Sequence, residues 1–242
     1  INPNQPFETL WQNPLTPKFS GVQIKIPANL TICSATGEKS ELTPAIKSAF
    51  THIVKPPPAQ ERHETIPTVE WMGLELSKVC GLETAEHSLL EMQEGEAPAL
   101  VVERFDIPSM SEVSVEKHTR IADFCNLTGL KPSDHKYGTD IDKCFEALSK
   151  VSSDPDTDIR LLFRRTALSF FIRDGDMHMK NISVLKSFDP ETGNKNVRLS
   201  PVYDTLTTVI YPELDEQRTS ALHYNPDPSN PDSQTRPIES ER

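Results

Sequence analysis

The sequence has no long apolar run and no two cysteines close together. No apolar stretch approaches the ~20 residues that span a bilayer, and the opening INPNQPFETLW lacks the basic-then-apolar pattern of a secretory signal. The 4 cysteines lie far apart with no CxxC pair, and this spacing does not make a zinc site or a disulfide framework. These absences predict a cytoplasmic protein with no membrane segment and with reduced, buried thiols.

Positive charge is also scarce. The chain carries 25 Lys and Arg against 36 Asp and Glu, which gives a net charge of −11. Nonspecific binding to nucleic acid depends on Lys and Arg neutralising phosphates. We therefore expect no direct binding to nucleic acid, and any role on DNA would need a partner. With 242 residues, the chain is long enough for two lobes or one large domain, and it can bury a proper core.

The most informative stretch is DGDMHMKNISVLKSFDPETGNKNVRLSPVYD, residues 174–204. Its segments 182–185 and 197–200 are typical of short strands, and the DPETGN between them is a turn sequence, so a β-hairpin is predicted. Asn181 directly precedes the first strand and Asp204 follows the second. Antiparallel pairing should therefore place their side chains close enough to share one cation. An amide oxygen and a carboxylate suit Mg²⁺.

Asp176 lies 5 residues before Asn181. This is the spacing between the catalytic Asp and the metal-binding Asn of the protein-kinase catalytic loop, and a metal-binding Asp after the next hairpin completes that arrangement. An isolated Asp-x-x-x-x-Asn in a loop is usually just solvated. The matched hairpin, with Asp204 at its far end, favours a functional site, in which Asp176 accepts the proton of a substrate hydroxyl.

The segments DGDMHMKN and SPVYD resemble the HipA family of bacterial serine/threonine kinase toxins. Three further segments match that family in the same order: SGVQIK (20–25), THIVKPP (51–57) and LVVERFD (100–106). The resemblance covers roughly Ser20 to Leu206. It implies an α+β, two-lobed protein-kinase-like fold with a β-rich N-lobe and a mainly helical C-lobe. It also implies a serine/threonine protein kinase that uses ATP and Mg²⁺.

The composition and the resemblance together predict the division of the chain. The predicted parts are an N-terminal arm (1–17), an N-lobe (18–106), a C-lobe with the catalytic loop and the metal-binding hairpin (107–224) and a disordered acidic tail (225–242). Within the N-lobe, residues 57–67 are polar and rich in proline, which predicts a mobile loop. In the family, the equivalent segment orders when substrate binds.

Hydrophobic periodicity predicts the other elements. We expect strands at 22–26, 30–34, 50–55 and 99–105, and helices at 67–80, 115–129, 140–152 and 156–172. The helix over 67–80 has an apolar stripe, which consists of Val69, Met72, Leu76 and Val79. The helix over 156–172 is nearly apolar apart from three arginines. It is therefore predicted to be the buried spine of the C-lobe.

The resemblance implies a phosphate-covering loop at Ser20, Gly21, Val22 and Gln23, with Ser20 as a candidate autophosphorylation site. A single glycine is far short of a glycine-rich phosphate loop, so without the family match an ordinary strand-opening turn is the better interpretation. Lys18 stands where family members carry a first serine. Control by autophosphorylation is therefore either carried by Ser20 alone or absent.

Four more N-lobe residues receive roles from the resemblance. Lys55, at the end of a strand, would contact the ATP phosphates and act in catalysis. Glu70 would pair with Lys55, although a glutamate in a first helical turn is favourable in any case because of the helix dipole. The main chains of Glu103 and Phe105 would bind adenine.

Two residues beside the catalytic loop complete the candidate cofactor site. His178 would contact phosphate or orient the loop, and a structural role is equally open. Tyr203 would pack the metal-binding turn. Both positions belong to the motifs that carry the resemblance.

The resemblance also implies a biological role. The family's targets are aminoacyl-tRNA synthetases, whose phosphorylation blocks translation, and its partners are antitoxins of the helix-turn-helix type. The short N-terminus resembles the HipT-like members, whose missing N-terminal domain is a separate small protein. Two alternatives stay open: an ATP-binding pseudokinase or interaction module, and a metal-dependent hydrolase that would use Asp174, Asp176, His178 and Asp204.

Overall fold

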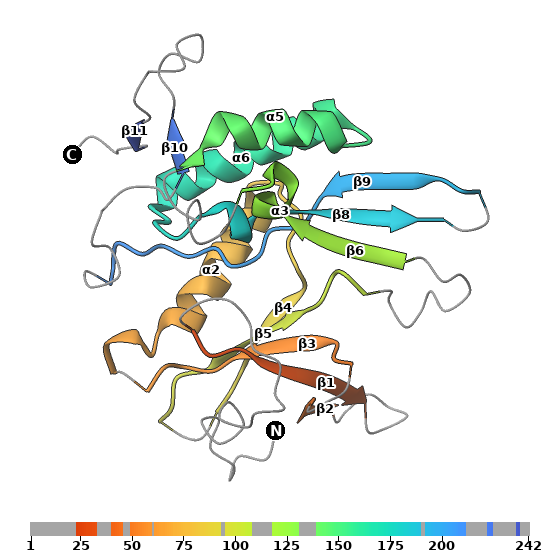
Figure 1. Cartoon of the computed structure of the whole chain (residues 1–242). Coiled ribbons are helices and arrows are strands. Elements are labelled where there is room, and N and C mark those ends of the chain that lie inside the picture. Colours follow the sequence, from red (N-terminus) through yellow and green to blue (C-terminus); the bar gives the residue numbers. More distant parts are fainter. Residues whose placement is uncertain are drawn as a thin grey trace. The chain divides into compact units, whose positions relative to one another are not determined.

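The computed structural model describes residues 23–32, 40–45, 49–59, 61–92, 95–107, 118–130, 139–189, 192–211, 222–224 and 236–237. These residues form helices and mainly antiparallel sheets (Figure 1). The chain separates into two compact units: unit 1 is Ile1–Met72 with Ala85–Phe105, and unit 2 is Gly73–Thr84 with Asp106–Arg242. The predicted arm, Lys18, Ser20, Gly21 and Val22 lie outside the described residues, as does the predicted tail apart from Arg236 and Pro237.

Unit 1 is built on a five-stranded sheet with the order β2-β1-β3-β5-β4. Its strands are β1 (Ile26–Ile32), β2 (Ser40–Pro44), β3 (His52–Lys55), β4 (His87–Leu90) and β5 (Ala99–Glu103). β1 replaces the two strands predicted at 22–26 and 30–34, because one continuous strand pairs with β3 at its start and with β2 beyond. β5 lies between β3 and β4 and is buried at its first four residues, as its apolar sequence predicts.

The helix predicted over 67–80 is α2 (Ile66–Val79), which follows the short 3-10 helix η1 (Glu61–His63). Its predicted apolar stripe is wrong as a buried face, because Met72, Leu76 and Val79 are 58%, 41% and 83% exposed. The residues that α2 buries are Ile66, Pro67, Glu70, Gly73, Leu74 and Ser77. Half of them are polar or glycine, so hydrophobic periodicity is a poor guide to this face.

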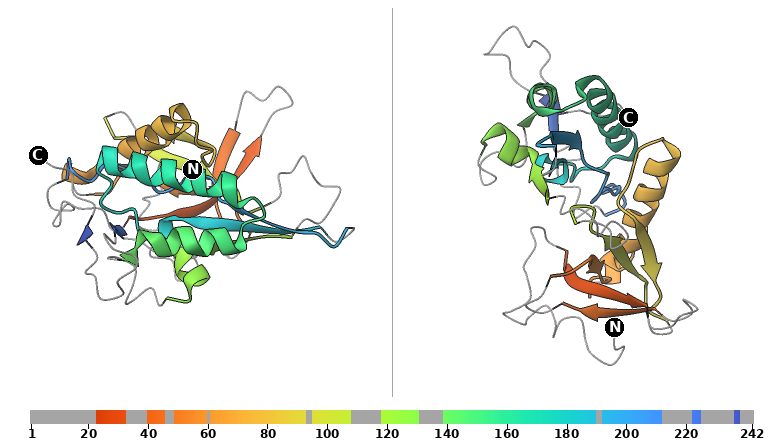
Figure 2. Two further views of the ribbon diagram at one scale, coloured as in Figure 1. Left: turned by 90° about the horizontal axis from the view of Figure 1, so that it is seen from above. Right: turned by 90° about the vertical axis from the view of Figure 1, so that its right-hand side faces the viewer.

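Unit 2 contains a three-stranded antiparallel sheet with the order β6-β8-β9. Its main elements are β6 (His118–Asp123), α3 (Phe124–Thr128), α5 (Ile141–Val151), α6 (Pro155–Ile172), β8 (Ser183–Phe188) and β9 (Lys195–Leu199). Helices α5 and α6 run side by side (Figures 1 and 2). The core contains Phe124, Cys125, Cys144, Leu148, Leu162, Met179, Ile182 and Val184.

The helix predicted over 115–129 is wrong in its first part. Residues 118–123 form β6, which pairs with β8 along its whole length, from His118 opposite Phe188 to Asp123 opposite Ser183. Asp123 then caps α3, since its Oδ1 accepts a hydrogen bond from the backbone N–H of Asn126 at 2.8 Å. The pairing with a distant strand outweighs the local helical pattern here.

Helix α6 has the predicted bounds within one residue, and Asp154 caps its start, with Pro155 in the first turn. The predicted apolar spine is wrong, however, because Phe163 and Phe171 are 64% and 78% exposed. The helix buries Asp158, Leu162, Arg165, Thr166 and Ser169. Most of the buried face of α6 is therefore polar.

A small third sheet has the order β11-β10-β7, with β7 (Thr139–Asp140), β10 (Leu222–Tyr224) and β11 (Arg236–Pro237). β10 pairs in parallel with β7 and antiparallel with β11. In the described part of the chain, none of the helices has both the length and the apolar character that crossing a membrane requires.

Candidate active site

The predicted β-hairpin is confirmed. β8 and β9 pair antiparallel, with Val184 opposite Leu199, and the backbone N–H of Ser200 donates to Ser183 O at 2.9 Å. This last contact continues the pairing toward the segments that carry Asn181 and Asp204. The hairpin therefore brings together two stretches of chain that are more than 20 residues apart in the sequence.

One guanidinium group joins the two ends of the hairpin segment. Arg165 on α6 is only 5% exposed, and its Nη2 donates to Asn181 O at 2.6 Å and to Tyr203 O at 3.3 Å. Asn181 is one predicted metal ligand, and Tyr203 directly precedes the other. In the sequence, this arginine is distinguished only as a polar residue on a nearly apolar helix. The signal was an arginine in a segment predicted to be buried, where it needs polar partners.

Asn181 lies in the short 3-10 helix η3 (Met179–Asn181) and is buried. Its backbone N–H donates to His178 O at 2.8 Å, and its side-chain Nδ2 donates to Asp176 O at 2.8 Å. This second contact directs the amide nitrogen toward the catalytic loop. The amide oxygen accepts no hydrogen bond from the described residues, so it is the atom that can bind a cation.

Asp204 has a φ of 48°, in the left-handed region that non-glycine residues seldom adopt. Such backbone strain persists where the surroundings impose it, and it clusters at functional turns. An amide oxygen with a carboxylate is a donor set that fits Mg²⁺, which also binds waters and substrate phosphates. Among the described residues, no group of three or more His, Cys, Asp or Glu side chains is placed to hold a metal ion.

Asp176 is held by its backbone, while its side chain is 48% exposed. Its N–H donates to Asp174 Oδ1 at 3.1 Å, and its carbonyl oxygen accepts from His178 N at 2.8 Å. His178 is buried, and its Nε2 lies 3.7 Å from Asp176 Oδ1. A carboxylate that is fixed at its backbone and open at its side chain suits a general base, which must reach a substrate.

Asp174 is a buried link within the same loop. Its Oδ1 accepts from the Asp176 N–H, and its Oδ2 accepts from Thr205 Oγ1 at 3.1 Å, so it joins the catalytic loop to the residue after Asp204. The pKa of Asp174 is raised to about 8. The main cause is burial, which disfavours the charged form, and the Asp176 carboxylate adds to it. From the sequence, Asp174 is a candidate only under the hydrolase alternative.

Tyr203 contacts protein groups on both its hydroxyl and its ring. The hydroxyl donates to Lys180 O at 2.9 Å and lies 2.5 Å from Ser183 Oγ, and burial raises its pKa to about 12. The Arg165 guanidinium lies 5.4 Å from the ring centroid, within cation–π range. These contacts suit the predicted role of packing the metal-binding turn.

Gly73 on α2 is a site residue that the sequence analysis missed. A Cβ at this position would lie 2.4 Å from Thr205 O, so only glycine allows the helix to approach the segment that follows Asp204. A glycine inside a helix is destabilising relative to alanine, which was the available signal for such a close approach.

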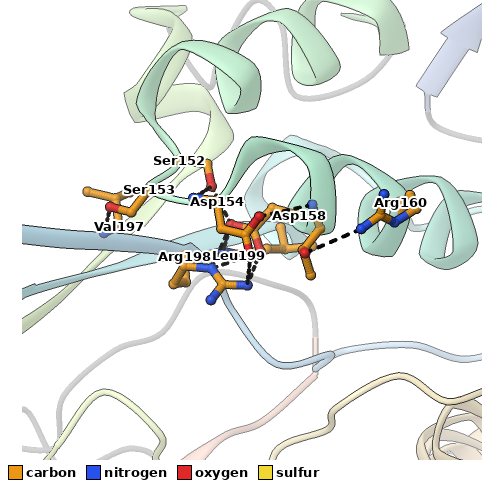
Figure 3. A network of polar contacts seen from close by, with 9 residues as sticks. Ser152, Ser153, Asp154, Asp158, Arg160, Val197, Arg198 and Leu199 are labelled. Carbon is orange, nitrogen blue, oxygen red and sulfur yellow. Dashed lines mark hydrogen bonds and ion pairs between the residues drawn. The ribbon is translucent and has the colours of Figure 1, made fainter.

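The N-terminal end of α6 holds β9 through a second polar network (Figure 3). Asp158, which is buried, accepts hydrogen bonds from Arg198 Nε at 3.2 Å, Arg198 Nη2 at 3.1 Å, Leu199 N at 3.0 Å and Ser152 Oγ at 2.6 Å. The backbone of Val197 also donates to Ser153 Oγ at 2.9 Å. One helix thus anchors β9 with Asp158 and the segments of the two predicted metal ligands with Arg165.

In unit 1, Lys55 ends β3 and its Nζ forms an ion pair with Glu70 Oε1 on α2. Both side chains are almost completely buried, at 4% and 2% exposure. The predicted pairing of Lys55 with Glu70 is therefore present. A buried amine needs such a partner to keep its charge.

The other predicted nucleotide residues of unit 1 are only partly described. The side-chain Nε2 of Gln23 is buried and has no hydrogen-bond partner among the described residues. Glu103 is exposed at the end of β5, and its backbone N–H donates to Glu86 O at 2.7 Å. A main-chain contact from Glu103 to adenine would therefore use its carbonyl oxygen. Phe105 follows two residues later.

Two solved structures share the fold of this chain. HipA from Shewanella oneidensis MR-1, solved as a toxin–antitoxin complex with HipB and operator DNA, matches 90% of this chain and 49% of its own with a TM-score of 0.65 and 21% identity. The proinflammatory kinase CtkA of Helicobacter pylori matches 77% of this chain and 66% of its own, with a TM-score of 0.52 and 14% identity. The chain therefore has a protein-kinase-like fold.

Sequence comparison then gives the family. The chain belongs to the family of HipA-like C-terminal domains, whose pattern matches residues 18–236. Two proteins of Sinorhizobium fredii, both named putative kinases, are similar to it: Y4mE is 32% identical over 208 residues, and Y4dM is 28% identical over 224 residues. These matches cover 84% and 88% of this chain. The chain spans about half the length of these relatives, 45% and 50%.

Proposed function

We propose that this chain is an ATP- and Mg²⁺-dependent serine/threonine protein kinase. The observation that carries the proposal is the Asp176–Asn181–Asp204 arrangement, in which Asn181 Nδ2 holds the Asp176 backbone and Arg165 holds the segments of both predicted ligands. The family membership and the relatives named putative kinases support it.

Unit 2 supplies the chemistry of phosphoryl transfer. Asp176 accepts the proton of a substrate serine or threonine hydroxyl and aligns that oxygen for attack. Asn181 and Asp204 would hold Mg²⁺, which would neutralise charge on the transferred phosphoryl group. His178 orients the Asp176 loop through the contact of its backbone with Asp176 O. Tyr203 packs the turn that carries Asp204.

Unit 1 supplies the contacts to the nucleotide. Lys55 binds the phosphates, and Glu70 keeps the lysine charged and directed. Gln23 belongs to the loop at 20–23 that covers the phosphates, and Ser20 in the same loop is the candidate autophosphorylation site. The main chains of Glu103 and Phe105 bind adenine.

For the biological role, we extend the proposal to the toxin of a bacterial toxin–antitoxin system in the cytoplasm. The similarity to a HipA that was solved with HipB and operator DNA supports an antitoxin partner of the helix-turn-helix type. The target would be an aminoacyl-tRNA synthetase. Contact with DNA would be made through the antitoxin.

The test is intact-mass spectrometry of the purified chain with Mg²⁺ and ATP, beside Asp176→Asn. The wild type should gain phosphate, mapped to Ser20 by peptide sequencing, and Asp176→Asn should lose about 10²–10⁴-fold of the rate. Asp156→Asn, an exposed carboxylate in the first turn of α6, is the matched control and should react like the wild type.

A wild type that gains no phosphate is then tested for nucleotide binding by thermal shift. Stabilisation by ATP without transfer to itself or to an added substrate would point to the pseudokinase alternative. A metal that binds equally well with and without nucleotide would point to the hydrolase. The structure gives the hydrolase little support, because both carboxylate oxygens of Asp174 already accept hydrogen bonds from Asp176 and Thr205.

A further inference from the structure

We propose that Arg165 is the positioning residue that sets the geometry of the two Mg²⁺-binding segments. The inference rests on the proposed function, because Asn181 and Asp204 are metal ligands only under that function. It assigns to Arg165 a role toward the metal, although the arginine itself coordinates nothing.

The contacts of Arg165 reach both ligand segments at their backbones. Nη2 donates to the carbonyl oxygen of Asn181 itself and to the carbonyl oxygen of Tyr203. The Tyr203 carbonyl group belongs to the peptide bond that joins Tyr203 to Asp204. Nη1 is buried and has no hydrogen-bond partner among the described residues, so Nη2 provides the anchoring hydrogen bonds. A shift of this one nitrogen would therefore change the separation of the two ligands.

The burial of Arg165 makes the position of its guanidinium rigid. The residue lies in the middle of α6, with 5% exposure, and its guanidinium stands over the Tyr203 ring. Tyr203 is itself fixed by its hydroxyl, which contacts Lys180 O and Ser183 Oγ. Arginine presents its donors in a planar, rigid fork, whereas lysine is a point charge on a flexible stem. The two N–H groups of Arg165 Nη2 are therefore held in the guanidinium plane and fix the directions of both hydrogen bonds, whereas the ammonium group of a lysine can rotate.

Because Arg165 is positively charged, a positioning role and a purely electrostatic role predict opposite changes in metal affinity when the arginine is removed. Burial lowers the pKa of Arg165, and the neighbouring Tyr203, Asp174 and Asp204 raise it. A cation so close to Asp204 repels Mg²⁺, so by charge alone the arginine weakens the site. If Arg165 acted on the metal only through its charge, replacing the arginine by a neutral residue would strengthen metal binding. If it positions the ligands, removing it must weaken metal binding despite the lost repulsion.

The experiment measures the Kd of Mn²⁺, a paramagnetic substitute for Mg²⁺, by electron paramagnetic resonance with a non-hydrolysable ATP analogue. The variants are Arg165→Met, which removes the charge and the fork, and Arg165→Lys, which keeps the charge alone. Arg164→Met is the matched control, because Arg164 directly precedes Arg165 on α6 and is exposed. Circular dichroism and the affinity for the analogue without metal check that each variant is folded.

We expect both Arg165 variants to bind Mn²⁺ about 10–100-fold more weakly, the size of effect typical for residues that orient metal ligands. Metal-free binding of the analogue and Arg164→Met should stay at the wild-type level. Arg165→Lys decides the question if Arg165→Met does not fold, since lysine keeps a cation in the buried site.

Two results would overturn the inference. Arg165 variants that lose thermal stability but bind Mn²⁺ like the wild type would show a structural role only. Tighter Mn²⁺ binding by Arg165→Met, with Arg165→Lys unchanged, would show that the arginine acts by charge. In both cases the proposed function stands, because the wild type binds the metal with nucleotide. A wild type that binds no Mn²⁺ with the analogue would overturn the proposed function and the inference with it.

Discussion

Helices α5 and α6 lie side by side in unit 2, yet they bury different kinds of surface (Figure 2). α5 buries Ile141, Cys144 and Leu148, whereas α6 buries Asp158, Arg165, Thr166 and Ser169 together with Leu162. α5 supplies the core, and α6 supplies anchors for backbone groups of β9 and of the catalytic loop. A helix that holds a site in place needs polar side chains inside, because its partners are backbone N–H and C=O groups.

The largest effect on stability is expected from a change in the apolar buried face of α5. Leu148→Ala should lower the free energy of unfolding by about 2–5 kcal/mol, because it removes a fully buried side chain and leaves a cavity. Urea unfolding measures the change, and Lys143→Ala on the exposed face of α5 is the control. The folded variant should keep the wild-type affinity for Mg²⁺–ATP. A loss of that affinity would mean that α5 also positions the site.

The matching change in α6 is Asp158→Ala. It leaves Leu199 N and Ser152 Oγ without their acceptor, and we expect a loss of about 2–3 kcal/mol in the free energy of unfolding. The loss stays moderate because Arg198 is 38% exposed and can be solvated. Asp156→Ala in the same turn is the control for helix effects. Equal stability of the two variants would show that the network in Figure 3 contributes nothing.

Gly73→Ala tests whether the close approach of α2 to Thr205 contributes to stability and to Mg²⁺–ATP binding. The new methyl group would meet Thr205 O at 2.4 Å, so the helix or the segment after Asp204 must move. Overpacking of this kind costs about 1–3 kcal/mol, against a gain of about 1 kcal/mol in helix propensity. We expect a small net loss of stability in urea and weaker Mg²⁺–ATP binding. A more stable variant with normal binding would contradict this close approach.

Asp174→Asn is expected to change how the stability depends on pH. The pKa of Asp174 is 3.8 in its ordinary state and about 8 in the fold, so the folded chain holds a proton that the unfolded chain releases between these values. The stability from this proton is complete below pH 3.8 and is lost as the pH rises through about 8.

Asparagine keeps an oxygen that can accept from Asp176 N, and it does not ionise. The free energy of unfolding of Asp174→Asn should therefore fall less than that of the wild type between pH 5 and pH 8. Urea titrations at several pH values compare the two slopes. Parallel slopes would show that Asp174 does not hold a proton in the folded chain.

The same contrast between α5 and α6 explains how far the sequence could predict the structure. The bounds of both helices and the buried face of α5 follow from apolar periodicity, and so does the hairpin of β8 and β9. The buried faces of α2 and α6 could not be predicted in this way, since Glu70, Asp158 and Arg165 are buried only because of partners that lie far away in the sequence. The strand β6 was missed for the same reason, because its pairing with β8 is a distant one.

For the candidate site, spacing was enough to select Asp176, Asn181 and Asp204, and the resemblance added the pair of Lys55 and Glu70. The sequence did not reveal what holds these residues in place, because an arginine or an aspartate on a helix gives no sign of its backbone partners. Arg165 and Gly73 became visible only through their contacts, and so did the role of Asp174 as a link between the two segments.

The central claim is that Asn181 and Asp204 bind Mg²⁺ together with a nucleotide. The most direct measurement is a calorimetric titration of the wild type with Mg²⁺ in the presence and absence of a non-hydrolysable ATP analogue, beside Asp204→Asn. We predict that the analogue strengthens Mg²⁺ binding, that Mg²⁺ strengthens binding of the analogue by the same factor, and that Asp204→Asn loses this coupling. Equal Mg²⁺ affinity with and without the analogue would contradict the claim.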